Sequence, residues 1–76
     1  MLDLYILNSC SYCQKVMSFL DTEKIAYNKM DISDKNILSK LIEIGGKEQV
    51  PFLHDFENNI KLYESNEIIK YLEERL

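Results

Sequence analysis

Two cysteines separated by two residues lie where the hydrophobic pattern of the chain changes. Before them, Leu2 to Leu7 is apolar apart from Asp3, which is typical of a short buried strand. After them, apolar residues recur at intervals of three and four, and this spacing predicts a helix over residues 11–24. Cys10 and Cys13 therefore lie at a strand–helix junction, and this placement restricts the fold more than any other feature of the sequence.

The remaining elements are predicted from apolar periodicity and from turn and cap residues. They are a second strand at 25–30, a second helix that follows the cap residues 31–34 and ends at Gly45-Gly46, a third strand beginning at Val50-Pro51, a turn at 57–59, a fourth strand at 60–63 and a last helix capped by Ser65. The predicted order is β-α-β-α-β-β-α.

The connections between these elements predict how the strands pair. A strand–helix–strand crossover is right-handed, so the first two strands should be parallel. The short turn before residue 60 should make the last two strands an antiparallel hairpin. Both constraints are met by a four-stranded mixed sheet with helices on both faces, and residues 1–76 are expected to form a single domain.

Length and charge exclude several classes of function. The chain has 76 residues, 9 Lys and Arg against 13 Asp and Glu, and a net charge of −4. An acidic surface argues against binding nucleic acid or an anionic membrane. No apolar run reaches the roughly 18 residues that cross a membrane, and the N-terminus has no basic region typical of a secretory signal. With two cysteines only, the expected location is the reducing cytoplasm.

The cysteine pair suggests redox chemistry. Cys10 is expected at a helix N-terminus, where unpaired N–H groups and the helix dipole stabilise a thiolate. Cys13 lies one turn later on the same face and should be more buried, so Cys10 would attack a disulfide and Cys13 would resolve the product. A C-x-x-C motif next to a βαβ pattern is typical of a thioredoxin-like redox site.

The sequence favours two other interpretations of the cysteines less. A zinc site normally needs four ligands, and His54 is the one further nitrogen or sulfur ligand in the sequence, so no metal site is predicted. The cysteines could also be two buried structural residues with no chemistry.

The motifs together resemble a known family. Cys10-Ser11-Tyr12-Cys13, Val50-Pro51 about forty residues later and Glu64-Ser65 at the last helix are similar to glutaredoxins. The stretch 62–72 is also similar to the N-terminal domain of glutathione S-transferases. The resemblance covers essentially the whole chain and implies a thioredoxin-like three-layer sandwich with glutathione as partner.

The resemblance also implies roles for individual residues. Val50, beside a family cis-proline at Pro51, would pair its backbone with the cysteinyl part of glutathione. Glu64 would meet the ammonium group of the γ-glutamyl end, and Ser65 its carboxylate. Tyr12 would flank the glutathione sulfur. Pro51 could instead be an ordinary trans proline that opens an edge strand.

The sequence departs from the family at several positions. Many glutaredoxins have proline where Ser11 stands, and Leu7-Asn8 replaces a basic residue that commonly precedes the motif. Lys47 is the candidate substitute for that cation, although it could equally be a solvated loop lysine. Gln49 stands where a threonine is common, and its amide could contact the glycyl end.

The sequence therefore predicts a glutathione-dependent thiol–disulfide oxidoreductase that acts as a monomer on glutathionylated or disulfide-containing proteins. The alternative is a carrier of a [2Fe–2S] cluster, held by Cys10 and glutathione in a bridged dimer, which Ser11 motivates. Two further readings are a thioredoxin-type reductase that does not use glutathione, and the N-terminal fragment of a transferase. An unpaired apolar face would indicate the transferase fragment.

Overall fold

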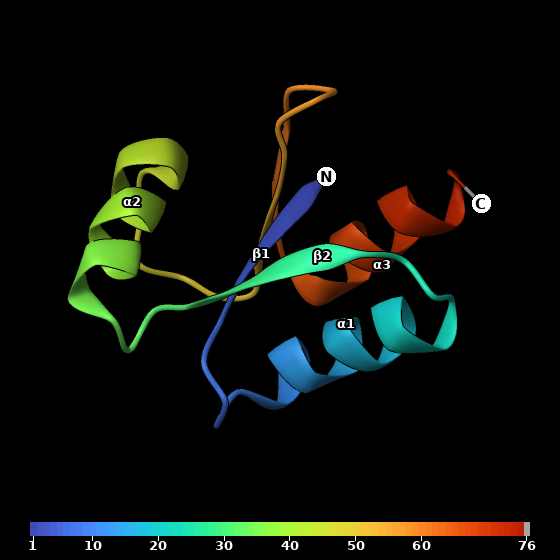
Figure 1. Ribbon diagram of the computed structural model, residues 1–76, viewed down its shortest axis with the longest axis horizontal. Coiled ribbons are helices and arrows are strands. Elements are labelled where there is room, and N and C mark those ends of the chain that lie inside the picture. The colour runs from blue at the N-terminus through green and yellow to red at the C-terminus, as the bar shows by residue number, and fades with distance from the viewer. Residues whose placement is uncertain (76) are drawn as a thin grey trace.

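The computed structural model describes residues 1–75, and it has the predicted order of elements (Figure 1). The elements are β1 (Leu2–Ile6), α1 (Ser11–Thr22), β2 (Tyr27–Asp31), α2 (Lys35–Gly45), β3 (Phe52–Asp55), β4 (Ile60–Tyr63) and α3 (Ser65–Glu73). The strands form one sheet in the order β2-β1-β3-β4. Within the described residues, no helix is long and apolar enough to cross a membrane.

The strand pairing confirms the predicted topology. β1 is parallel to β2 and antiparallel to β3, and β3 is antiparallel to β4. Helices α1 and α3 lie on one face of the sheet and α2 lies on the other (Figure 1). The central strand β1 therefore leads along the chain to the two cysteines and also pairs with strand β3 of the hairpin.

Each residue of β1 is buried, and alternate side chains enter different cores. Leu2, Leu4 and Ile6 pack against α1 and α3, whereas Tyr5 packs with Phe52 against α2. This is the period-two pattern of a strand covered on both faces. The Tyr5 hydroxyl is fully buried and has no hydrogen-bond partner within residues 1–75.

Two predicted boundaries near the first crossover were wrong. Helix α1 ends at Thr22 instead of continuing to Lys24, because Lys24 adopts a left-handed conformation with φ of 56°. The chain then needs residues 25 and 26 to turn back, so β2 begins at Tyr27 rather than at Ile25. Apolar periodicity did not reveal this left-handed residue.

Helix α2 ends as predicted at its two glycines. Gly46 is in the left-handed region with φ of 88°, and its N–H donates to the carbonyl of Ile42 at 2.8 Å. Gly45 lies against the Tyr63 ring, where a Cβ atom would overlap the phenol oxygen. Tyr63 in turn donates to the Lys47 carbonyl at 2.9 Å and fixes the loop that leads to Pro51.

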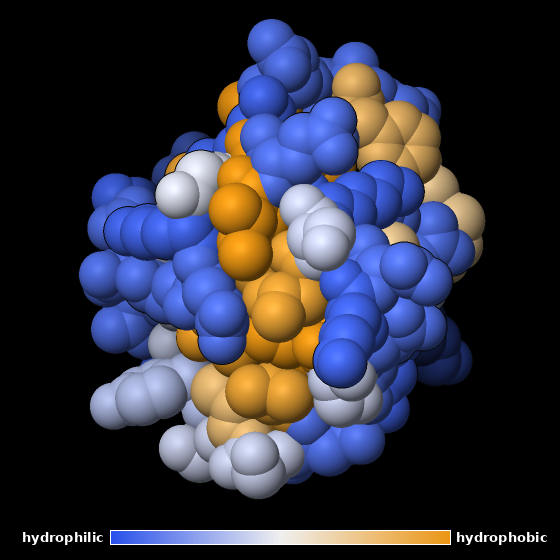
Figure 2. All heavy atoms as spheres, turned by 90° about the vertical axis from the view of Figure 1, so that its left-hand side faces the viewer, coloured by the Kyte–Doolittle hydropathy of each residue, from blue (hydrophilic) through white to orange (hydrophobic). Residues whose placement is uncertain are grey.

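Figure 2 views the molecule from the α2 side and shows a strip of apolar side chains between hydrophilic ones. Helix α2 buries Leu41 completely, whereas Ile42 in the same helix is 43% exposed. Helix α2 therefore covers part of its sheet face and leaves apolar atoms in contact with solvent.

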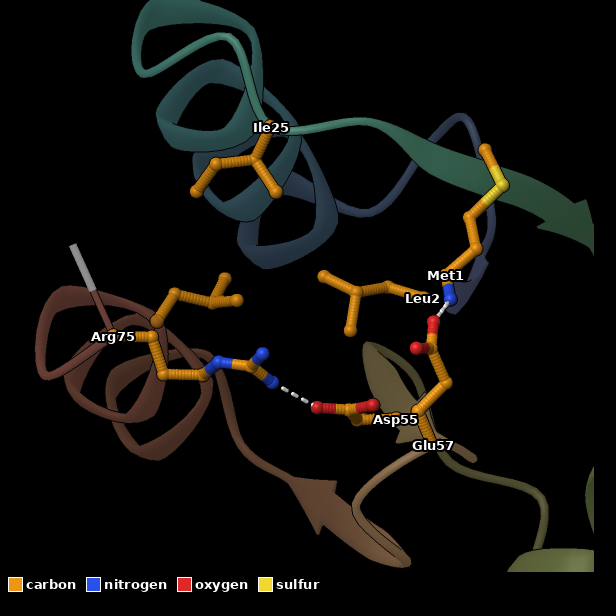
Figure 3. Close-up of a pocket in the computed structure, with 7 residues that line it drawn as sticks. Met1, Leu2, Ile25, Asp55, Glu57 and Arg75 are labelled. Carbon is orange, nitrogen blue, oxygen red and sulfur yellow. Dashed lines mark hydrogen bonds and ion pairs between the residues drawn. The ribbon is translucent and has the colours of Figure 1, made fainter.

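A buried carboxylate joins the end of α3 to the sheet (Figure 3). Asp55 is 1% exposed, and it accepts hydrogen bonds from Tyr71 at 2.5 Å, from Asn58 at 2.9 Å and from Arg75. Burial alone would raise the pKa of Asp55, but the hydrogen bonds and the Arg75 charge outweigh it and lower that pKa below the usual value.

The first prediction concerns acid stability. Because the folded-state pKa of Asp55 is below its unfolded value, its stabilisation is present above about pH 4 and is lost as the pH falls through the folded pKa. Asp55→Asn should lower the free energy of unfolding at neutral pH by about 1–3 kcal/mol. Urea unfolding at a series of pH values should show a smaller acid dependence for the variant than for the wild type. Asp21→Asn serves as the control. If Asp55→Asn has the same acid dependence as the wild type, Asp55 does not contribute to acid stability as assigned.

The second prediction concerns the glycine under Tyr63. Gly45→Ala should displace the Tyr63 ring and reduce the free energy of unfolding by about 1–3 kcal/mol, because the added methyl group has no room. Thermal denaturation measures the effect. Ser39→Ala, an exposed substitution in the same helix, should change stability by less than about 0.5 kcal/mol. Equal effects of the two substitutions would show that the ring accommodates the methyl group without cost.

Candidate functional site

Cys10 is the residue that caps α1. Its backbone is extended, and its Sγ accepts a hydrogen bond from the N–H of Cys13 at 3.3 Å. The first backbone N–H groups of a helix have no partners inside the helix, so this sulfur takes the place that a Ser or Asp cap usually fills.

Cys13 has a different environment. It is fully buried, whereas Cys10 is partly exposed, and the two thiols are not joined in a disulfide. Burial first, and then the hydrogen bond to Cys10 and the charge on Cys10, raise the pKa of Cys13 to about 12. Cys13 therefore holds its proton at neutral pH, and the predicted difference in burial between the two cysteines is confirmed.

A shallow pocket lies beside this helix end. It has a volume of about 350 Å³, and the residues that line it are Tyr12, Gln49, Val50, Pro51, Glu64, Ser65 and Asn66. The Val50–Pro51 peptide bond is cis, which the sequence had left open. Cys10 does not itself line the pocket, but Tyr12, two residues later in the first turn of α1, does, so the thiol lies at the same helix end.

The start of α3 forms one side of the pocket. Glu64 occupies the N-cap position with φ of 68°, a region that few residues other than glycine adopt. The prediction that Ser65 caps α3 was wrong, because Ser65 is the first helical residue and α3 has no side-chain cap. The first N–H groups of α3 are therefore available to an anion in the pocket.

The structure brings most of the predicted binding residues to one pocket, with Lys47 as the exception. The Lys47 ammonium group lies over the Tyr63 ring, 4.6 Å from its centroid, and Lys47 does not line the pocket. Asn66 lines the pocket but was not predicted, because a polar residue in the first turn of a helix has no distinguishing pattern. Lys15 donates to the Asn66 amide oxygen at 3.0 Å and supplies a cation near this end of α3.

No cluster of three or more His, Cys, Asp and Glu side chains suited to a metal ion occurs within residues 1–75. The site consists of one partly exposed thiol, one buried thiol and a pocket with an uncapped helix N-terminus. Chemically, this arrangement is suited to exchange between a thiolate and a disulfide whose carrier has an anionic end.

Three solved structures have the same fold. The thioredoxin-like protein BC3987 superposes with a TM-score of 0.84 at 19% identity and 100% coverage of both chains. The glutaredoxin from Archaeoglobus fulgidus gives 0.79 at 23% identity, with 96% of this chain and 82% of that chain covered. Glutaredoxin 2 from Salmonella typhimurium, in complex with glutathione, gives 0.78 at 23% identity; the match covers 95% of this chain but 32% of that one.

These similarities establish a thioredoxin-like fold, as predicted. Among curated proteins, none matches the sequence significantly. The sequence matches the family described as "Glutathione S-transferase, N-terminal domain" over residues 4–76. Because this match extends over nearly the whole chain, the protein belongs to the family of glutathione S-transferase N-terminal domains.

Proposed function

We propose that the protein is a glutathione-dependent thiol–disulfide oxidoreductase with Cys10 as its nucleophile. The observation that carries this proposal is the difference between the two thiols: Cys10 is partly exposed at a helix N-terminus, and Cys13 is buried and protonated. If the two cysteines had only a structural role, neither thiol would need to be exposed near a pocket. The family match and the glutathione complex of the Salmonella glutaredoxin support glutathione as the ligand.

The pocket offers a partner for each end of glutathione. The backbone N–H and C=O of Val50 have no backbone partner in the described part of the chain, so they can pair with the cysteinyl residue of the ligand. The γ-glutamyl carboxylate would accept hydrogen bonds from the Ser65 hydroxyl and from the free N–H groups of α3. Glu64 would hold the ammonium group, and Tyr12, 65% exposed, would flank the sulfur.

The reaction has two exchange steps. The Cys10 thiolate attacks the glutathione sulfur of a protein–glutathione disulfide, and the protein sulfur leaves as a thiolate, which then takes a proton from water. A second glutathione thiolate then attacks the glutathione sulfur on Cys10, which releases oxidised glutathione and restores the Cys10 thiolate. Burial raises the pKa of Cys13, and this cause persists when Cys10 carries glutathione, so resolution by external glutathione should be faster than resolution by Cys13.

This proposal predicts unequal effects of removing the two thiols. Cys10→Ser should reduce turnover of a glutathionylated peptide to the background rate, because the remaining thiol, Cys13, is fully buried. Cys13→Ser should keep at least half of the wild-type rate in the same coupled assay. Full activity of Cys10→Ser, or loss of activity in a folded Cys13→Ser variant, would reject the assigned roles.

Ser65 should affect binding more than chemistry. Ser65→Ala removes a hydroxyl that would donate to a carboxylate of the bound glutathionyl group, and such a bond is worth about 1.5–3 kcal/mol, or roughly a tenfold or greater increase in KM for a glutathionylated peptide. The matched control is Ser18→Ala, on the exposed face of α1. Steady-state kinetics should show that the mixed disulfide of the same peptide with 2-mercaptoethanol, which lacks the carboxylate, is used equally well by Ser65→Ala and the wild type. Parallel losses with both disulfides would indicate a folding defect instead.

The bridged [2Fe–2S] dimer stays a prediction, as do the monomeric state and the cytoplasmic location. Anaerobic reconstitution with iron, sulfide and glutathione separates the cluster carrier from the oxidoreductase. A colourless monomer after reconstitution argues against the carrier.

A further inference from the structure

A second groove lies on the opposite face of the sheet from the cysteines. It has a volume of about 420 Å³ and lies between the sheet and α2, on the α2 side viewed in Figure 2. Its polar lining consists of Asp3, Asn28, Lys40 and His54. None of these residues lines the pocket beside Cys10.

The polar lining comes from a row of side chains that crosses the sheet. Asp3 in β1 is opposite Asn28 in β2 and His54 in β3, and His54 is opposite Lys61 in β4. Residues that are opposite each other on neighbouring strands point to the same face. The next row along the strands, which includes Tyr5 and Phe52, packs under α2. Helix α2 therefore covers the apolar row and leaves part of the polar row in the groove.

Asp3 is the most unusual member of this row. It is 8% exposed, yet its carboxylate accepts only one hydrogen bond from residues 1–75, from the Asn28 side chain to Oδ1 at 2.8 Å. Its second oxygen, Oδ2, has no partner in the same residues. Oδ2 is accessible from the groove rather than sealed in the core, so a ligand in the groove can donate a hydrogen bond to it.

The other walls of the groove add an apolar surface and a cation. Met30, Ile44 and Phe56 complete the lining, and the Phe56 ring is 48% exposed and lies edge-on to His54 at 5.9 Å. Lys40 is exposed on α2 and forms no ion pair within the described chain. The groove thus combines a hydrogen-bond acceptor, a flexible cation and an apolar wall.

We propose that this groove binds a small zwitterion with an apolar side chain, namely a free α-amino acid. Its ammonium group donates to Oδ2 of Asp3, its carboxylate pairs with Lys40, and its side chain packs against Ile44 and Phe56. A simple amine satisfies Asp3 but is repelled by Lys40, and a simple carboxylate is repelled by Asp3. The site is independent of the proposed redox function, because it lies on the other side of the sheet from Cys10.

Three matched probes test the proposal: L-phenylalanine, 2-phenylethylamine and 3-phenylpropionate. Each is titrated into the ¹⁵N-labelled full chain at millimolar concentration. Phenylalanine should cause saturable amide shifts at Asp3, Asn28 and His54. The two probes that lack one charged group should bind at least about tenfold more weakly, since each loses a charge-assisted hydrogen bond. Equal binding of 3-phenylpropionate, or no saturable shift at these amides, would overturn the proposal.

Variants locate the two charged contacts. Asp3→Asn should weaken phenylalanine binding at least about tenfold, whereas Asp21→Asn on α1 should leave it unchanged. Lys40→Gln, an exposed change that should not affect folding, should weaken phenylalanine but not 2-phenylethylamine. Cys10→Ser should bind phenylalanine like the wild type. This variant therefore tests the groove independently of whether the proposed redox function is correct. Unchanged affinity in both Asp3→Asn and Lys40→Gln would contradict the proposed contacts.

Discussion

The complete burial of β1 is the constraint on which the rest of the structure depends. Since both faces of this strand are covered, its even-numbered residues must be apolar, and they form the core with α1 and α3. A shift of one residue in register would exchange the two faces and bury the wrong side chains. The same strand ends four residues before Cys10, so its position also determines where this partly exposed thiol lies.

The chemical difference between the two cysteines follows from that geometry. The chain leaves the carboxyl end of β1, turns, and reaches Cys10, whose sulfur caps the N-terminus of α1. One turn later, Cys13 faces the core between the sheet and α3, and burial raises its pKa. Two identical side chains three residues apart thus have different environments, because one is partly exposed at the helix end and the other lies in the core.

The pocket and the groove show two uses of the same sheet. Beside Cys10, segments distant in sequence supply backbone groups and helix N–H groups, which suit an extended anionic ligand. Across the sheet, side chains from neighbouring strands supply a carboxylate with one accessible oxygen beside apolar walls. The chain is acidic overall, with a net charge of −4, so in both places local groups rather than net charge must attract a ligand's carboxylate.

The sequence by itself determined the element order, the strand pairing and the position of the two cysteines at a strand–helix junction. Apolar periodicity, crossover handedness and motif spacing, which predict these features, are local properties. Only the tertiary structure decided the cis bond at Pro51, the left-handed Lys24 and Glu64, and the position of Lys47 over Tyr63. It also decided that Asp3 lies between Asn28 and His54 with Oδ2 open to the groove, since these neighbours come from other strands. These features depend on contacts between residues far apart in sequence, and no local pattern encodes them.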